Sequence, residues 1–219
     1  MYKYALEILN IINNLGYESY IIGGYPRDLY LGIENPDIDI CTNAKYEDLK
    51  DSFEITSNNF GSMTLIYKNN KYEITTYRKE YEYEKNRFPK KIEFVKTLEE
   101  DLQRRDFIIN TLCIDKDGNY IDLLRARKDL DNKIIRCVGN SDLKISEDIL
   151  RSLRAIRFAT ILNFEIDETL KQSIKKYNYL LDNLSYKRKK EELDKIMNNK
   201  NKQYGLSLIK ELDLEKYLK

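Results

Sequence analysis

Apolar residues near the start of the chain recur at the spacing of an α-helix. Leu6, Leu9 and Ile12 would share one face of this helix, and residues 2–15 are expected to be helical until Gly16 ends the segment. The apolar runs that follow are shorter and are separated by turn-forming residues. This change of pattern predicts that the chain passes from a helix into a series of strands.

Strand patterns continue to about residue 123. The expected strands are 19–22, 37–42, 62–68, 71–78, 92–95, 113–115 and 120–123. Asn69-Asn70 and residues 116–119 have the composition of tight turns between neighbouring strands. The expected helices of this region are 28–31, 45–49 and 97–112. The charged, tyrosine-rich segment 79–91 has few core residues, and we expect a mobile loop there.

From about residue 124 onward the strand patterns disappear and the apolar spacing becomes helical. Ile149, Leu153 and Ile156 would form one face of a helix, opposite Arg151 and Arg154. The chain is therefore predicted to be an α+β protein, in which a small mixed sheet with helices precedes an all-helical domain. We expect the first domain at residues 1–123 and the second at residues 124–219.

Composition supports a folded, soluble protein and excludes several classes of site. Hydrophobic residues make up 42% of the chain and charged residues 34%, and no apolar run is long enough to span a membrane. The apolar N-terminal segment is broken by polar residues, unlike a signal peptide, and the three separated cysteines indicate a reduced, cytoplasmic setting. Histidine is absent, which excludes Ser-His-Asp catalysis and His-ligated zinc.

The formal charge of +1 hides a difference between the two halves of the chain. Residues 120–219 hold 22 basic and 16 acidic side chains, a net charge of +6, whereas residues 1–119 have a net charge of −5. A basic surface attracts the phosphates of a nucleic acid, so the second half is the expected RNA-binding part. The basic residues proposed for it are Lys175, Lys176, Lys187, Arg188, Lys189 and Lys190.

The chemistry of the first half is concentrated in two short motifs. Gly23-Gly24 lacks side chains that would keep a phosphate away from the backbone. Asp37 and Asp39, two apart on an expected strand, would present both carboxylates on one face while Ile38 enters the core. Each motif alone is usually a turn or a solvated strand face. Together they indicate a site that binds Mg²⁺ and nucleotide phosphates for nucleotidyl transfer.

These motifs also resemble those of a known family. Gly-Gly-x-x-Arg-Asp-x-x-Leu-Gly at 23–32, followed by Asp-x-Asp, resembles the head motif of class II tRNA nucleotidyltransferases and bacterial poly(A) polymerases, which belong to the polymerase-β-like superfamily. Four further segments match in order, namely 74–78, 83–89 with Tyr83, Arg87 and Pro89, 104–110, and 147–158. The resemblance extends from about residue 20 to residue 218.

The resemblance implies a fold and an activity. The fold would be a polymerase-β-like nucleotidyltransferase head followed by a helical neck. The activity would be the addition of C and A to the tRNA 3′ end from CTP and ATP, with Mg²⁺ or Mn²⁺ and without a nucleic-acid template. CC-adding, A-adding and poly(A)-adding enzymes share all of these motifs. An inactive RNA-binding module is the alternative from another class, and the Asp37/Asp39 pair argues against it.

The resemblance also implies roles for individual residues. Asp37 and Asp39 would be the catalytic metal ligands, with Glu73 the candidate for a third carboxylate. Gly23, Gly24 and Arg27 would hold the triphosphate, although Arg27 could instead form an ion pair with Asp28. The other nucleotide-binding residues implied by the resemblance are Arg105, Asp106, Asn110, Asp148, Arg151, Arg154 and Arg157.

Two of these groups would select the nucleotide. Asp106 would accept a hydrogen bond from the ribose 2′-hydroxyl, at what we expect to be the start of a helix. Asp148 and Arg151 would imitate a complementary base edge, on a helix that Ser146 could cap. An intrahelical salt bridge is the alternative for this last pair. In full-length relatives the neck ends about where this chain ends, so we expect either a natural minimal enzyme or a fragment.

Overall fold

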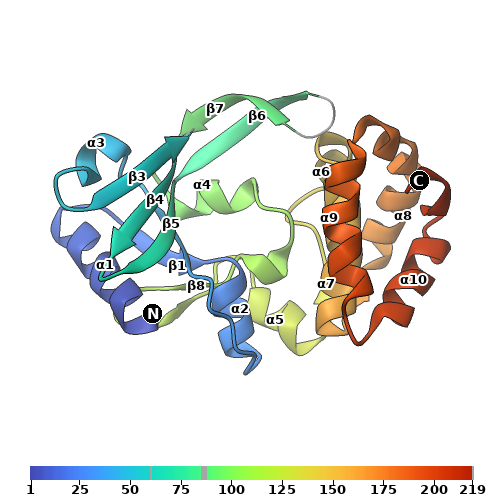
Figure 1. The fold of residues 1–219 in the computed structure, drawn as a ribbon, viewed down its shortest axis with the longest axis horizontal. Helices are drawn as coiled ribbons and strands as arrows, with labels where there is room; N and C mark the ends of the chain where they lie inside the picture. Colours follow the sequence, from blue (N-terminus) through green and yellow to red (C-terminus); the bar gives the residue numbers. More distant parts are fainter. Residues whose placement is uncertain (60, 85–87, 219) are drawn as a thin grey trace. The chain divides into compact units, whose positions relative to one another are not determined.

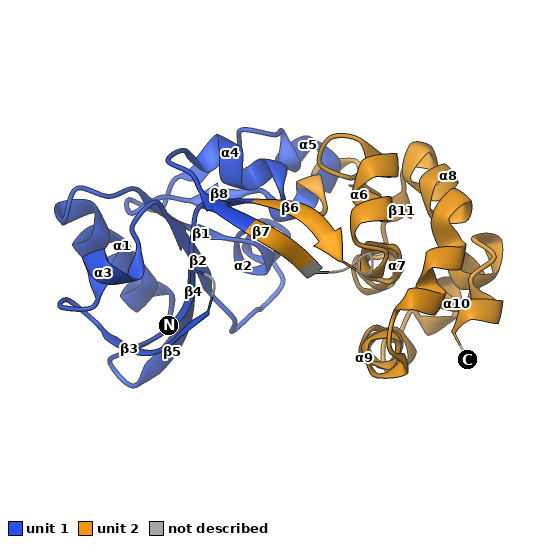
Figure 2. Cartoon of the chain, turned by 90° about the horizontal axis from the view of Figure 1, so that it is seen from above, with its two compact units in different colours: residues 1–79, 92–105, 109–130 blue, residues 80–91, 106–108, 131–219 orange. Residues whose placement is uncertain are grey.

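The computed structural model describes residues 1–59, 61–84 and 88–218. The chain forms two compact units, which Figure 2 shows in different colours. Unit 1 comprises residues 1–79, 92–105 and 109–130, and unit 2 comprises residues 80–91, 106–108 and 131–219. Among the described residues, no helix combines the length and the apolar character that crossing a bilayer requires.

Unit 1 is built on a seven-stranded mixed sheet (Figure 1). Its strands are β1 (Ser19–Ile22), β2 (Asp39–Thr42), β3 (Glu54–Asn59), β4 (Ser62–Tyr67), β5 (Asn70–Thr76), β8 (Cys113–Ile114) and β9 (Tyr120–Ile121). Their order in space is β3-β4-β5-β2-β1-β8-β9. The pairing of β2 with β5 is parallel, and the other pairings are antiparallel. The helices are α1 (Tyr2–Asn14), α2 (Gly24–Tyr30), α3 (Tyr46–Leu49), α4 (Leu98–Gln103) and α5 (Ala126–Asp131).

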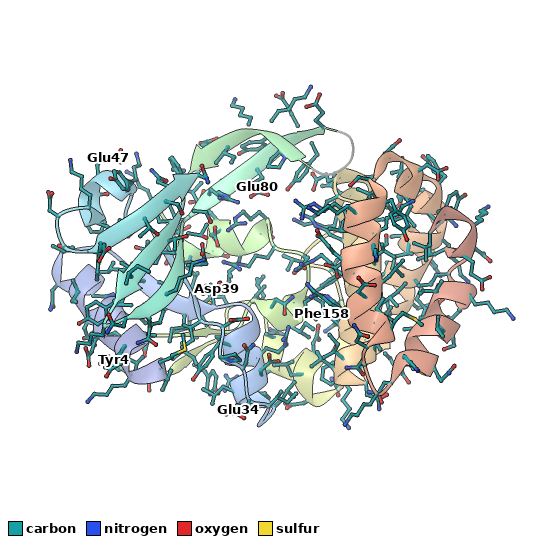
Figure 3. The ribbon with its side chains drawn as sticks, viewed as in Figure 1. Tyr4, Glu34, Asp39, Glu47, Glu80 and Phe158 are labelled. Atoms are coloured by element: carbon teal, nitrogen blue, oxygen red, sulfur yellow. The ribbon has the colours of Figure 1, made fainter. Side chains whose placement is uncertain are left out.

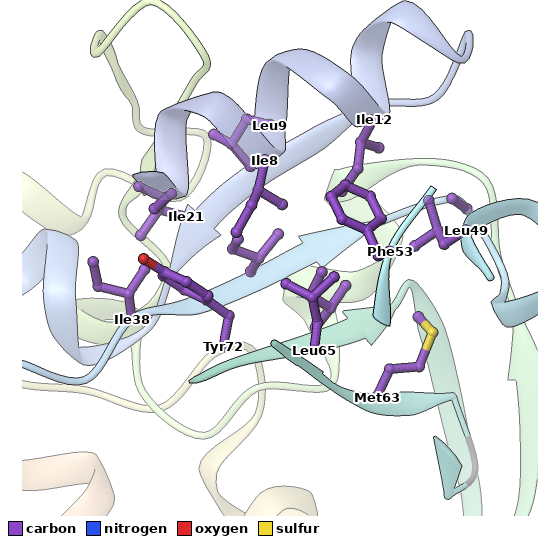
Figure 4. Packing of buried hydrophobic residues seen from close by; sticks show 14 of the residues in the cluster. Ile8, Leu9, Ile12, Ile21, Ile38, Leu49, Phe53, Met63, Leu65 and Tyr72 are labelled. Carbon is purple, nitrogen blue, oxygen red and sulfur yellow. The ribbon is translucent and has the colours of Figure 1, made fainter. Parts of the chain in front are cut away.

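The sheet has a hydrophobic core on each face, because side chains alternate along its central strands. Ile21 and Ile40 point into a cluster that includes Ile8 and Ile12 of α1, and Figure 4 shows this packing from close by. The residues that follow Ile21 and Ile40 in sequence belong to a second cluster, with Leu102 of α4. Each fully buried Ile or Leu contributes about 1.5–3 kcal/mol, so the two clusters hold the central strands firmly.

Unit 2 is mainly helical and is centred on α7. Its helices are α6 (Ser141–Glu147), α7 (Leu150–Leu162), α8 (Glu168–Tyr177), α9 (Tyr186–Met197) and α10 (Lys202–Glu211), with 3₁₀ turns η2 (Asn178–Asn183) and η3 (Glu215–Tyr217). Helix α10 approaches its neighbours closely at Gly205, where a Cβ would lie 2.5 Å from Ile196 Cγ2 and 2.5 Å from Thr160 Oγ1. A residue without a side chain is therefore required at this contact.

The first helix and most of the expected strands are confirmed, with small changes at their ends. The hairpin that joins β4 to β5 turns at Lys68 and Asn69, which both have positive φ, rather than at Asn69-Asn70. The expected helix at 28–31 is wrong at its start, because α2 begins at Gly24. Strand β3 was not expected, since its residues are mostly exposed and lack an apolar alternation.

Three expectations about larger segments are wrong. The segment 79–91 is not a simple loop, because β6 (Arg78–Glu84) and β7 (Phe88–Phe94) form a two-stranded sheet. The helix expected at 97–112 ends at Gln103, and a 3₁₀ turn, η1 (Ile108–Asn110), follows it. The second half also contains two short strands, β10 (Ile134–Ile135) and β11 (Glu165–Ile166), which pair in parallel.

Candidate active site

The two carboxylates of the Asp-x-Asp motif lie where the chain enters the sheet. Asp39, which is labelled in Figure 3, is the first residue of β2 and pairs with Ile22 of β1 and Glu73 of β5. Asp37 precedes the strand instead of lying within it. Ile38, which lies between the two aspartates in sequence, is buried and anchors the segment in the core, as expected. A local strand-like alternation therefore still separates the carboxylates from the core.

The electrostatic surroundings of Asp39 favour binding of a cation. Asp39 is exposed, but the protein atoms around its carboxyl group partly desolvate it and so raise its pKa; the positive charge of Arg105 opposes this shift, and the negative charges of Glu73 and Asp37 add to it. A divalent cation would relieve this crowding of carboxylates. Asp37 and Asp39 offer the hard oxygen ligands that Mg²⁺ prefers, and they fit an ion that is also bound by water and phosphate oxygens.

Glu73 lies beside Asp39 but is bound by other residues. It faces the same side of the sheet, because the two are register partners in the parallel pairing of β2 and β5. Its Oε1 accepts a hydrogen bond from Thr64 Oγ1 at 3.0 Å and lies 3.2 Å from Lys71 Nζ. Within residues 1–59, 61–84 and 88–218, no three acidic or cysteine side chains are grouped so that they could hold a metal. The role of Glu73 as a third metal ligand stays a prediction.

The paired glycines bring the backbone close to Asp39. Gly23 has φ +86°, a conformation that favours glycine, and a Cβ there would lie 3.5 Å from Asp39 Oδ2. Helix α2 begins immediately after it, at Gly24. A Cβ on Gly24 would lie 3.2 Å from Asn35 Nδ2 and 3.6 Å from Arg27 Nη2, so this position has little room for a side chain.

Arg27 is buried and bound on two sides. Its Nε and Nη2 donate to the two carboxylate oxygens of Asp28 at 2.7 and 2.9 Å, the ion pair that the sequence left as an alternative. Its Nη1 donates to Asn110 Oδ1 at 2.7 Å, which joins two motifs 83 residues apart in sequence. The bidentate pair fixes the plane of the guanidinium group. The side chains of Arg27 and Asn110, both predicted to bind nucleotide, are therefore held in one fixed arrangement.

Asn35 is part of the same network, and the sequence motifs gave no reason to select it. Its Nδ2 donates to Asp28 Oδ2 at 2.7 Å, and its Oδ1 accepts a hydrogen bond from the backbone N–H of Asp37 at 2.9 Å. The only signal in the sequence is the Asn-Pro dipeptide before Asp37, which is typical of a turn. The tertiary contact with Asp28 cannot be read from that dipeptide.

Arg105 is held by an acidic residue that was also missed. Asp101 is fully buried and accepts hydrogen bonds from Arg104 Nε at 2.9 Å, Arg105 Nη2 at 3.1 Å and the backbone N–H of Arg78 at 3.2 Å. Burial alone would raise the pKa of Asp101, but the charges of Arg105 and Arg104 and these hydrogen bonds keep it below its usual value. Asp101 therefore stays ionised and fixes the guanidinium whose charge acts on Asp39.

Asp106 pairs with an arginine of α7 within unit 2. Both Nε and Nη2 of Arg154 donate to Asp106 Oδ2, at 2.8 and 2.6 Å, and the charge of Asp106 raises the pKa of Arg154. The backbone around Asp106 is tied to residues 136–138, because Val138 N–H donates to Asp106 O and Phe107 forms a bridge with Cys137. Asp106 thus lies after the helix α4 rather than at the start of a helix, which corrects the sequence prediction.

Asp148 lies at the break between α6 and α7 and accepts a hydrogen bond from Leu150 N–H at 3.1 Å. The capping role predicted for Ser146 is therefore wrong, since Ser146 lies inside α6. Arg151 is also buried, with its Nε 4.0 Å from Asp148 Oδ2, and its Nη1 donates to the carbonyl of Lys144 at 2.9 Å. The Cζ atom of Arg151 lies 5.8 Å from the ring centroid of Tyr83. The two predicted base-reading residues are thus neighbours in a buried polar cluster.

Arg157 lies apart from this cluster and pairs with a different helix. Its Nε is 2.8 Å from Glu192 Oε2 of α9, at an angle that does not meet hydrogen-bond geometry, so the contact is an ion pair. Its Cζ is also 4.3 Å from the ring centroid of Phe158, which is labelled in Figure 3. Arg157 thus has a structural contact that competes with its predicted role in nucleotide binding.

The basic residues proposed for RNA binding differ in exposure. Lys175, Lys187 and Lys190 have exposed side chains. Lys189 is buried and its Nζ donates to the carbonyl of Tyr217 at 2.6 Å, so its charge is used inside unit 2. Two others form surface ion pairs, Lys176 with Asp142 and Arg188 with Glu191. Arg87, predicted in the segment 83–89, lies outside the described residues.

Family comparisons divide the chain into two parts. Residues 19–136 match the family described as "Poly A polymerase head domain". Residues 163–219 match the family described as "Probable RNA and SrmB- binding site of polymerase A". The first match contains the Gly-Gly and Asp-x-Asp motifs, and the second contains all six basic residues proposed for RNA binding.

Similar proteins include CCA-adding enzymes. The chain is 41% identical over 219 residues to the CCA-adding enzyme of Ligilactobacillus salivarius, covering 99% of this chain and 54% of the relative. It superimposes on the crystal structure of the Bacillus stearothermophilus CCA-adding enzyme in complex with CTP with a TM-score of 0.90, at 34% identity, over 98% of this chain and 53% of that chain.

A further solved structure, a tRNA nucleotidyltransferase complexed with a primer tRNA and an incoming ATP analog, is 27% identical, with a TM-score of 0.76, over 95% of this chain and 61% of that one. The chain therefore spans about half the length of the curated relatives it matches.

Proposed function

We propose that the chain adds C and A to the 3′ end of tRNA from CTP and ATP. It belongs to the poly(A) polymerase head-domain family and has the head and neck of class II CCA-adding enzymes and poly(A) polymerases. The observation that carries this proposal is the pair Asp37 and Asp39 beside the Gly23-Gly24 turn, inside a matched head domain. We propose residues 1–123 for the head and 124–219 for the neck.

The chemistry proposed for unit 1 is metal-dependent transfer. When bound by Asp37 and Asp39, Mg²⁺ would activate the attacking 3′-hydroxyl and stabilise the leaving pyrophosphate. The chain itself supplies the two ligands and a backbone without side chains at Gly23 and Gly24 for the triphosphate. Arg105, held by Asp101, keeps a positive charge near Asp39 and so favours its ionised, metal-binding form. No covalent enzyme intermediate is needed.

The chemistry proposed for unit 2 is choice of the nucleotide. Asp106 accepts two hydrogen bonds from Arg154 at one oxygen, Oδ2, and one from Phe107 N–H at Oδ1. Asp148 and Arg151 supply an acceptor and a donor group in one buried cluster, as reading of a base edge requires. Both arrangements support the roles that the family resemblance implies, selection of ribose and selection of C and A over U and G.

Enzymes that make other products have the same motifs. An enzyme that adds only CC, only A or a poly(A) tail would present the same residues in both units. An RNA-binding module without transfer activity is the alternative from another class. The pair Asp37 and Asp39 argues against that alternative, because two carboxylates next to a phosphate-accommodating turn would repel RNA phosphates.

One experiment tests the proposal and its alternatives. Each of the four NTPs is incubated with tRNA that ends before, within or after CCA, in Mg²⁺, and the products are resolved at single-nucleotide length. CCA addition gives C on tRNA that ends before CCA or after its first C, A on tRNA that ends in CC, and nothing on the completed end. Asp37→Ala is the control, and it should remove transfer by several orders of magnitude while the protein still binds tRNA. Transfer at a normal rate by Asp37→Ala would exclude the mechanism.

A further inference from the structure

The side-chain amide of Asn35 connects two parts of the unit 1 site that are otherwise separate. One part is the buried pair Arg27 and Asp28, in which both nitrogens Nε and Nη2 bind the carboxylate. The other is the metal-binding segment that begins at Asp37. Asn35 Nδ2 donates to Asp28 Oδ2 at 2.7 Å, and Asn35 Oδ1 accepts from Asp37 N–H at 2.9 Å. Both bonds have ordinary lengths.

The orientation of this amide is fixed by its partners. An ionised carboxylate can only accept hydrogen bonds and a backbone N–H can only donate one. The amide must therefore point its NH₂ group at Asp28 and its oxygen at Asp37. Gly24 leaves room for this amide, because a Cβ there would lie 3.2 Å from Asn35 Nδ2. Asn35 is half-buried, and its two hydrogen bonds fix both ends of its amide.

The bond to Asp37 N–H has a direct consequence for the metal-binding carboxylate. Asp37 precedes β2 and is exposed, so no sheet hydrogen bond fixes its backbone. Pro36 cannot donate a backbone hydrogen bond, so the bond from Asp37 N–H to Asn35 is the polar contact that holds this segment on the side of Asp37 away from the buried Ile38. A backbone fixed at Asp37 limits the directions that its carboxylate can take relative to Asp39.

We propose that Asn35 is a positioning residue that sets the Asp37 carboxylate for metal binding and couples it to the Arg27–Asp28 pair. This rests on the proposed function of the same site. Groups that orient a metal ligand without touching the metal typically change metal affinity or activity by about 10–100-fold when they are lost. The two halves of the amide serve different purposes: the oxygen acts on the metal ligand, and the NH₂ group acts on the residues predicted to hold the triphosphate.

Two substitutions separate these halves. Asn35→Ala removes both hydrogen bonds. Asn35→Asp keeps an oxygen for Asp37 N–H but replaces the donor that faces Asp28 by a second carboxylate. Glu34→Gln is the matched control, because Glu34 is exposed in the same loop (Figure 3) and its change conserves size. Asp37→Ala serves as the reference for loss of the metal ligand.

The main readout is direct binding of Mn²⁺ to the protein without nucleotide, measured as the loss of the free Mn²⁺ spin-resonance signal, which needs no turnover. We expect Asn35→Ala to weaken Mn²⁺ binding about tenfold. We expect Asn35→Asp to bind Mn²⁺ within about twofold of the unchanged protein but to raise the KM for CTP at least fivefold. Glu34→Gln should change neither quantity, and the thermal midpoints of all four variants show whether they are folded.

Each outcome decides between the inference and the function on which it rests. If Asp37→Ala abolishes Mn²⁺ binding while both Asn35 variants behave like Glu34→Gln, the role of Asn35 is wrong and the proposed function stands. If both Asn35 variants lose metal and nucleotide binding only in proportion to a lower thermal midpoint, Asn35 is merely structural and the inference is overturned. If Asp37→Ala binds Mn²⁺ normally, the proposed metal site itself is wrong.

Discussion

Asp39, a proposed metal ligand, lies in surroundings that work against the stability of the fold. Partial desolvation and the charges of Glu73 and Asp37 raise the pKa of its carboxyl group, so the ionised form is less favourable in the folded chain than in the unfolded one. The positive charge of Arg105 opposes this shift. A side chain that is retained in such surroundings is expected to have a function other than stability.

We therefore expect Asp39→Asn to remove transfer activity without destabilising the protein. The amide has the same shape but no charge, so it relieves the repulsion from Glu73 and Asp37 while it loses the metal ligand. Urea unfolding at pH 7 should give a midpoint equal to or above that of the unchanged chain, and Mn²⁺ binding should be lost. A clearly lower midpoint would show that the carboxylate contributes to folding instead.

Lys144 presents a similar conflict in unit 2. Its side chain is only 8% exposed, and burial, together with the positive charge of Arg151, lowers its pKa to about 8. An unfolded lysine has a pKa of about 10.4, so between these two values the unfolded state binds more protons and this group makes stability rise with pH. At neutral pH the folded protein holds a buried ammonium group at a cost.

We expect Lys144→Met to stabilise the protein at pH 7 by about 1–3 kcal/mol, which corresponds to the size of the pKa shift. The gain should shrink as the pH rises through 8 and be nearly absent by about pH 10.5, where lysine is neutral in both states. Urea unfolding of both proteins across this range measures the difference. A gain that is independent of pH would mean that packing, and not ionisation, separates the two side chains.

At the scale of elements, local patterns predicted what local contacts determine. The apolar face of residues 2–15 and the burial of Ile38 follow from spacing alone, and both are confirmed. The helix expected at 97–112 failed, because periodicity does not show that Phe107 pairs with Cys137, thirty residues later. The contact is tertiary and overrides a helical pattern that would otherwise continue.

The candidate site shows the same limit. Motif spacing selected Arg27 and Asn110 separately, and the structure joins them by a hydrogen bond of 2.7 Å. Asp101 and Asn35 were not selected, because a buried acid and a loop amide carry no motif of their own. Their importance comes from the residues that they hold, which only the fold identifies.

Helices α7, α9 and α10 pack closely around Gly205. A Cβ at position 205 would lie 2.5 Å from Ile196 Cγ2 and Thr160 Oγ1, so Gly205→Ala requires a shift of backbone or neighbours. Alanine would gain about 1 kcal/mol from helix propensity, while overpacking costs about 1–3 kcal/mol. We expect a net loss of up to about 2 kcal/mol in urea unfolding.

Ser207→Ala, on the exposed side of the same helix, is the control for propensity. It should leave stability nearly unchanged or raise it slightly, because serine is a somewhat weaker helix former than alanine. If Gly205→Ala is as stable as Ser207→Ala, the three helices are packed less closely than the structure shows.

At the scale of the whole molecule, the two parts of the chain differ in the sign of their net charge. The net charge is −5 for residues 1–119 and +6 for residues 120–219. The sequence alone placed the expected RNA surface in the second part, and the match of residues 163–219 to an RNA-binding family agrees with this placement. It could not show that Lys189 is buried, because burial of a lysine depends on the carbonyl of Tyr217 near the end of the chain.

The second part of the chain is expected to bind tRNA through its exposed lysines. The exposed lysines Lys187 and Lys190 on α9 would contact phosphates and release counterions, so affinity should fall steeply with salt. Replacing both by alanine should weaken binding at low salt and reduce the slope of log K against log salt by about 1.5–2. Replacing Lys3 and Lys50, which are equally exposed in the acidic part, should leave the slope unchanged. A short acceptor-stem hairpin should bind nearly as well as whole tRNA if the phosphates contacted by these lysines lie near the 3′ end. A preference for whole tRNA by orders of magnitude, or an equal slope for both pairs of variants, would place the RNA-binding surface elsewhere.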